Sequence, residues 1–199
     1  MDLTQGTEQE KTARSKKMML WFGIISMVMM FAGLTSAYVV SSERQDWLND
    51  FTLPASFIWS TLAIVTSSIT LFIAKKQLRA NNRKGATYSL LATLVLGVIF
   101  VGLQLQGFED IINLGFYFTG SESSITTSFI YVLVLAHLAH IAAGLIVLLV
   151  LIYNHFKQRY TAEQMLGFEL GATFWHFVDV LWLYLFVFLY FFQAAQSCI

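Results

Sequence analysis

The chain contains little charge, little proline and almost no cysteine. Charged residues make up 12% of its 199 residues and hydrophobic residues 57%, a balance outside that of ordinary soluble domains. Twelve basic and twelve acidic residues cancel, so the composition gives no reason to expect nucleic-acid binding. A single cysteine, Cys198, excludes an internal disulfide and a cysteine-cluster metal site. These scarcities predict an integral membrane protein.

Long apolar runs fill most of the chain. Five of them reach the roughly 20 residues that a helix needs to cross a bilayer, and none alternates as a strand does. We therefore predict an all-α integral membrane protein, a bundle of five transmembrane helices over residues 18–40, 55–74, 86–106, 125–153 and 170–193. Residues 1–17 are expected to form a polar cytoplasmic segment rather than a signal peptide, and residues 194–199 a short tail.

Basic residues gather on one side of the predicted membrane. Eleven of the twelve lie in residues 1–17 or in the segments after the second and fourth runs, whereas Arg44 alone lies on the other side. The positive-inside rule therefore places the N-terminus in the cytoplasm and the C-terminus outside. The eleven are Lys11, Arg14, Lys16, Lys17, Lys75, Lys76, Arg79, Arg83, Lys84, Lys157 and Arg159.

Four ionisable side chains fall inside the apolar runs, where such groups are expensive and need a partner or a function. His137 and His140 lie in the fourth run, and His176 and Asp179 lie in the fifth. Each pair is three positions apart, so its two members share one side of a helix. His140 and Asp179 would lie at similar depth in adjacent antiparallel helices. We therefore expect one structural polar cluster, in which the fifth-run pair faces the fourth run.

Several functions are open to these four groups. Haem ligation needs histidines on facing helices, and His176 is the one histidine inside another apolar run that could pair with His137 or His140. Zinc or copper has less support, because Asp179 would be the only hard ligand nearby. Proton conduction uses such groups, whereas the structural alternative is a hydrogen-bonded cluster that fixes packing. The residue chemistry favours the structural alternative, and Glu169 at the mouth of the fifth run fits an interfacial role.

A specific motif stands in the fifth run. Gly167-Phe168-Glu169 is followed by Trp175-His176-Phe177-Val178-Asp179-Val180-Leu181-Trp182-Leu183. Further matching residues are His137, His140 and Gly144 in the fourth run, Thr66 to Thr70 and Arg79 in the second, and Gly97, Phe100, Gly102 and Gln104 in the third. Together, over about residues 18–193, these residues resemble subunit III of the haem-copper cytochrome c oxidases.

The resemblance implies an accessory, non-redox subunit of a proton-pumping cytochrome c oxidase of aerobic respiration. It implies a bacterial inner membrane, a periplasmic C-terminus, and no catalytic or metal-binding residue in this chain, because haem and copper belong to subunits I and II. Subunit I would be the main partner, structural phospholipids would be bound, and sustained turnover and proton uptake would be supported. A respiratory supercomplex remains open.

Two other functions remain as alternatives. One is the equivalent subunit of a quinol oxidase or of a nitric oxide reductase relative, since nothing in the chain selects the electron donor. The other is an independent haem-binding membrane cytochrome that uses the three histidines of the runs.

The chain also departs from the family pattern. Longer members have seven helices, whereas five are predicted here, matching the last five. Met27 stands where the family has an intramembrane glutamate, and Gly107-Phe108 stands where it usually has Glu-Tyr. A role that needs a carboxylate at either position is therefore not carried over.

Overall fold

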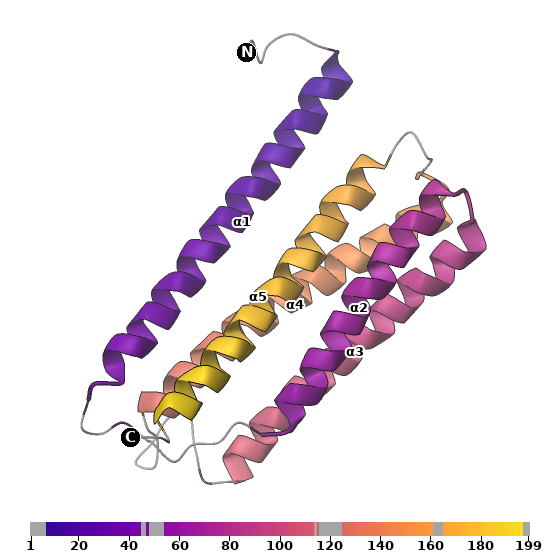
Figure 1. Ribbon diagram of the computed structural model, residues 1–199. Helices are drawn as coiled ribbons and strands as arrows, with labels where there is room; N and C mark the ends of the chain where they lie inside the picture. The colour runs from indigo at the N-terminus through magenta and orange to yellow at the C-terminus, as the bar shows by residue number, and fades with distance from the viewer. Residues whose placement is uncertain are drawn as a thin grey trace.

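The computed structural model describes residues 7–44, 47, 54–113, 115, 125–160 and 165–196. Five long α-helices make up this described part (Figure 1), and each is long and apolar enough to cross a membrane. They are α1 (Glu8–Ser41), α2 (Ser56–Arg79), α3 (Arg83–Asn113), α4 (Ile125–Phe156) and α5 (Leu166–Gln196). The predicted all-α chain with five candidate spans is thus confirmed, whereas its orientation stays a prediction. Residues 197–199, including Cys198, lie outside the described residues.

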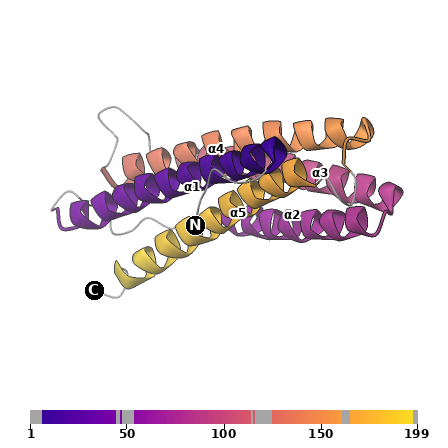
Figure 2. The same cartoon turned by 90° about the horizontal axis from the view of Figure 1, so that it is seen from above.

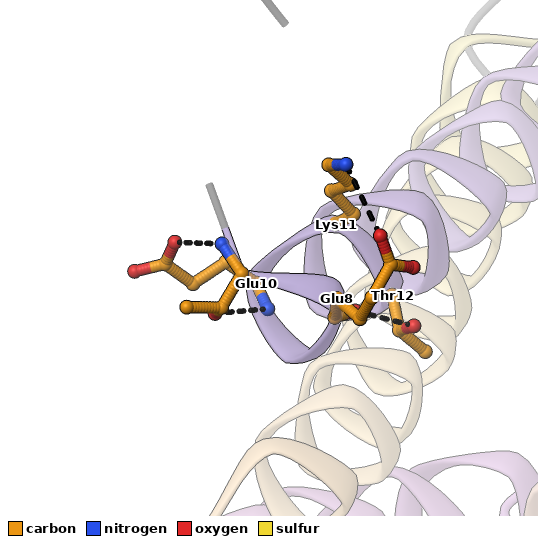
Figure 3. Close-up of polar contacts among 5 residues, drawn as sticks. Glu8, Glu10, Lys11 and Thr12 are labelled. Atoms are coloured by element: carbon orange, nitrogen blue, oxygen red, sulfur yellow. Dashed lines mark hydrogen bonds and ion pairs between the residues drawn. The ribbon is translucent and has the colours of Figure 1, made fainter. Parts of the chain in front are cut away.

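Helix α1 begins ten residues before the apolar run that predicted it. Thr7 and Glu10 form a capping box: the Thr7 hydroxyl accepts from the Glu10 amide at 3.4 Å, and the Thr7 amide donates to the Glu10 carboxylate at 3.0 Å. Lys11 and Glu8 add an ion pair at 3.1 Å (Figure 3). Because this box satisfies amides that the helix leaves unpaired, the segment expected only to be polar forms the first turns of α1.

Helices α2 and α3 form a tight antiparallel hairpin. Asn81 connects them with a left-handed φ of 57°, a conformation that asparagine tolerates better than most residues. Polar contacts then recur along the pair, and each joins one side chain of α2 to one of α3. They are Ser56–Asp110 at 2.6 Å, Ser60–Gln104 at 2.8 Å, Thr70–Thr93 at 2.8 Å and Gln77–Ser89 at 3.2 Å.

The remaining helices complete the bundle around this hairpin. α5 packs against α2 and α4, and α4 also packs against α3. Among the described residues, α1 contacts only α4 and α5. Figures 1 and 2 show α1 along one side of the bundle, with the α2–α3 hairpin on the other and α5 between them.

Trp175 of α5 lies where four helices meet. Its side chain is 2% exposed, and its indole nitrogen donates to Ser67 of α2 at 3.0 Å. A Cβ atom added to Gly97 of α3 would lie 2.8 Å from the indole ring, and one added to Gly144 of α4 would lie 3.2 Å from it. Two of the small residues on the apolar runs therefore make room for one large side chain, which sets the spacing of α2, α3, α4 and α5.

Substituting Gly97 tests this packing. We expect Gly97→Val to destabilise the bundle by about 1–3 kcal/mol, because the added methyl groups would overlap the Trp175 ring. The matched control is Gly102→Val on the same helix, where an added Cβ atom would meet nothing within 4 Å. The measurement is the thermal unfolding of the purified proteins in lipid nanodiscs. Equal unfolding temperatures for the two variants would contradict the proposed role of Gly97.

Candidate functional site

The polar side chains of the α5 motif point to α2. Trp175 donates to Ser67 at 3.0 Å, and Trp182, which is fully buried, donates its indole N–H to Thr61 at 3.0 Å. The two contacts run in antiparallel order along the helices, because Thr61 precedes Ser67 whereas Trp182 follows Trp175. The motif therefore fixes the register between α2 and α5.

His176 and Asp179 lie beside the same helix. The Ser68 hydroxyl is 2.6 Å from Nδ1 of His176, and both Ser68 and His176 line a groove together with Asp179. The carboxyl is deeply placed, with 3% of Asp179 exposed. The expectation that this pair faces the fourth run is therefore wrong. A helical pattern shows which residues share a side of α5, but it does not identify the helix packed on that side, which is α2.

His137 and His140 form a separate group on α4. The His137 ring is surrounded by aromatic rings from three other helices, with centroid distances of 6.4 Å to Phe31, 6.0 Å to Phe100 and 5.1 Å to Trp182. His140 donates from Nδ1 to the Ala136 carbonyl at 2.7 Å. Neither His137 nitrogen has a hydrogen-bond partner among the described residues, so aromatic packing is the environment that the fold supplies to this side chain.

The four ionisable groups are thus two pairs rather than one cluster. His137 and His140 lie against Phe31 of α1, whereas His176 and Asp179 lie against Ser68. In the part of the chain that the structure describes, no three side chains of the His, Cys, Asp or Glu type are grouped so that they could hold a metal ion.

Ion pairs join α2 and α5 at one end of the bundle. Glu169 accepts from Arg79 at 2.8 Å and lies 3.3 Å from the Lys75 ammonium. It is a partly exposed site, and such pairs contribute modestly to stability. The contact continues the antiparallel register set by the two tryptophans. Glu169 is therefore the fourth point at which the motif meets α2, after Trp175, His176 and Trp182.

The first part of the motif packs against the connection before α5. A Cβ atom on Gly167 would lie 3.4 Å from the Tyr160 ring, and the fully buried Phe168 meets that ring edge-on at 5.9 Å. Burial raises the pKa of the Tyr160 phenol, although a hydrogen bond from Asn154 and the charge of Arg159 oppose the shift. Gly167 and Phe168 thus hold the chain that leads into α5.

Comparison with known proteins identifies the family of the chain. The family description "Cytochrome c oxidase subunit III" matches residues 3–194. The chain belongs to the cytochrome c oxidase subunit III family. Similar proteins named cytochrome c oxidase subunit 3 are found in several organisms.

Three such relatives show the extent of the similarity. One from Pyricularia grisea is 35% identical over 144 residues, 72% of this chain and 50% of the relative. One from Petromyzon marinus is 29% identical over 181 residues, 84% and 66% of the two chains. One from Alkalihalophilus pseudofirmus is 32% identical over 130 residues, 65% and 62%. The chain thus spans about half the length of the Pyricularia grisea relative.

The two departures from the subunit III pattern have different surroundings. Gly107 is buried against Phe57, and an added Cβ atom would lie 3.0 Å from that ring, so a glutamate there would require the ring to move. The nearby carboxylate that is present, Asp110, accepts instead from Ser56 at 2.6 Å. Met27 lies half-buried on α1. Neither position places a carboxylate inside this subunit III bundle.

The sequence analysis named Thr66 to Thr70 as matching residues, but it did not assign any residue of α2 as a partner of the α5 motif. Thr61, Ser67 and Ser68 each pair with an α5 side chain. A signal was present, because the hydroxyl-rich segment from Thr66 to Thr70 interrupts an apolar run. Such hydroxyls in a membrane helix often bond across to a neighbour, which could have pointed to α2 rather than α4.

Removing one of these hydroxyls tests the contact. We expect Ser67→Ala to destabilise the chain by about 1–3 kcal/mol, because it leaves the buried Trp175 N–H without its acceptor. Thr66→Ala is the control, since the exposed Thr66 hydroxyl bonds only within its own helix, to the Leu62 carbonyl at 2.7 Å. Thermal unfolding in nanodiscs, followed through tryptophan fluorescence, measures both. A larger loss in Thr66→Ala than in Ser67→Ala would contradict the assignment.

Proposed function

We propose that this chain is the accessory, non-redox subunit III of a proton-pumping cytochrome c oxidase. The observation that carries the proposal is the α5 motif, whose Trp175, His176 and Trp182 pair with hydroxyls of α2. These side chains act in packing, so the redox chemistry is assigned to partner subunits that hold haem and copper. The chain packs beside the catalytic subunit I and supports stable turnover and proton uptake.

Structural phospholipids are part of this proposal. A groove of about 530 Å³ between α1, α4 and α5 has mostly apolar walls, with Lys16, Asn154 and Tyr160 among its lining residues. Apolar walls suit acyl chains, and a lysine favours an anionic headgroup near the membrane surface. These features support lipid binding as one of the functions of the subunit.

Orientation and location follow the charge distribution. We propose that the N-terminus lies in the cytoplasm, that the C-terminus lies in the periplasm, and that the membrane is a bacterial inner membrane. Alkalihalophilus pseudofirmus, one source of a relative, supports a bacterial setting. A second candidate, the equivalent subunit of a quinol oxidase, differs only in the electron donor, which neighbouring subunits determine.

Deleting this chain from its host tests the proposed function. We expect membranes that lack the chain to keep the haem absorbance of the oxidase, because the haem lies in other subunits, while sustained oxygen consumption falls. The measurements are the difference spectrum of the membranes and repeated turnover with reduced cytochrome c or with quinol. Purified isolated chain should show no Soret band. A Soret band in the isolated chain would instead support the independent-cytochrome alternative.

Single-cysteine labelling tests the proposed orientation. In a Cys198→Ser background, Lys84→Cys is expected to react with an impermeant thiol reagent only after the cytoplasmic face is opened. Ser42→Cys, at the opposite end of the bundle, should react in intact cells whose outer layers are permeable to the reagent. The measurement is the extent of labelling before and after lysis. The reverse pattern would overturn the orientation.

A further inference from the structure

A groove of about 470 Å³ runs between α2 and α5 on the outside of the bundle. Ser68, His176 and Asp179 supply its polar side chains, and apolar side chains form the rest of its wall. The apolar residues are Val65, Ile69, Phe72, Val180 and Leu183. The groove therefore offers a polar floor beneath an apolar rim.

The Asp179 carboxyl is unsatisfied in this groove. Asp179 is 3% exposed, and neither of its oxygens has a hydrogen-bond partner among the described residues. Ser68 lies near the carboxyl, but its hydroxyl has one proton and its 2.6 Å contact is to His176. Even if that proton turned to Asp179, the second carboxyl oxygen would still need a donor.

The depth of Asp179 restricts what can supply this donor. Asp179 is the fourteenth residue of a 31-residue helix, about 20 Å along the axis from the first residue at 1.5 Å per residue. Lipid headgroups carry donors at the membrane surfaces, whereas acyl chains carry none. A donor at this depth therefore comes from a side chain of another membrane-spanning segment.

The exposed face of α2, which supplies Val65, Ile69 and Phe72 to the rim of the groove and continues beyond it, has the pattern of a helix-packing surface. Five large apolar residues of α2, all at least 36% exposed, follow one another at alternating intervals of four and three positions. This spacing is that of a left-handed helix–helix seam. The residues are Ile58, Leu62, Val65, Ile69 and Phe72.

A neighbouring groove differs from the α2–α5 groove because its polar side chain already has a partner. It lies between α1 and α5, and Val28, Phe31 and Tyr184 are among its lining residues. The Tyr184 hydroxyl already pairs with Thr35 at 3.0 Å. Only the α2–α5 groove therefore combines, among the described residues, an apolar seam with a buried carboxyl that lacks a donor.

We propose that the α2–α5 groove docks a transmembrane helix of another oxidase subunit, and that Asp179, whose carboxyl oxygens are covered in the isolated chain, turns its carboxyl to a hydrogen-bond-donating side chain of this helix. The inference rests on the proposed function, because it requires a membrane partner. It goes beyond that function by assigning the face of the chain, the depth of the contact and the chemistry of the partner residue.

Photo-crosslinking in the purified complex tests the assigned face. A photoreactive amino acid replaces Ile69 in the groove or, as the control, Val95 on α3; both native side chains are 56% exposed. The 2.8 Å contact between the neighbouring residues Thr70 and Thr93 places the two sites at similar depth. We expect Ile69 to crosslink to a membrane-spanning peptide of another oxidase subunit, identified by mass spectrometry. Lipid adducts alone, or no more protein crosslinking than at Val95, would overturn the proposal.

Substituting Asp179 tests the hydrogen bond. We expect Asp179→Leu to leave about three- to thirtyfold less chain bound to the complex after detergent washing, as loss of an interhelical hydrogen bond in a membrane implies. Asp179→Asn, which keeps an acceptor oxygen, should retain more than Asp179→Leu. Thermal unfolding of each isolated variant shows whether it is folded. If either variant is unfolded, the crosslinking experiment at Ile69 decides the proposal.

The experiments distinguish a failure of the proposed function from a failure of the docking inference. If the wild-type chain recovers no haem-containing subunit, the proposed function fails. If it does, but the Ile69 site crosslinks only lipid and Asp179→Leu binds as well as Asp179→Asn, the docking inference alone fails.

Discussion

The membrane interior supplies no water to polar side chains, so every polar atom there needs a partner from the protein. In this bundle α2 provides most of those partners. Its Ser60 and Thr70 pair with α3, whereas its Thr61, Ser67 and Ser68 pair with α5. One helix thus carries hydroxyls on two sides and holds two neighbours in register. Apolar packing alone does little to fix how far one helix is shifted along another in a bilayer. These directional hydrogen bonds fix that shift.

The α5 motif, through which the sequence resembles subunit III, makes contacts of this kind. Its tryptophans, histidine and glutamate each meet a group on α2, over a length that reaches from Thr61 to Arg79. Trp175 adds the close fit to glycines of α3 and α4. These side chains therefore fix the position of α5 against α2. Asp179 is the exception, since its carboxyl remains without a donor in the described part of the chain.

Much of the fold could be predicted from the sequence, because the length of an apolar run depends only on local composition. Each predicted run lies within one helix, apart from Ala55, which caps α2. The early start of α1 could also have been found from Thr7 and Glu10, which form a capping box. The hydroxyls from Thr66 to Thr70 could have pointed to α2 as a neighbour of α5. The pairing of His176 with Ser68 itself could not be predicted, because periodicity relates residues on one helix only. Adjacency depends on long-range packing, such as the fit of Trp175 between Gly97 and Gly144.

The order of the helices along the chain has a consequence for biogenesis. The α2–α3 hairpin pairs several of its polar side chains between its own two helices, so it suits entry into the bilayer as one unit. The hydroxyls of α2 that face α5 have no such partner until α5 has been synthesised. Helix α1 precedes α4 and α5 in the chain and contacts only those two helices among the described residues, so both of its neighbours are synthesised after it. Helix α5 therefore completes the bundle, because it packs against α1, α2 and α4. A chain truncated before α5 would leave Thr61, Ser67 and Ser68 of α2 without their partners.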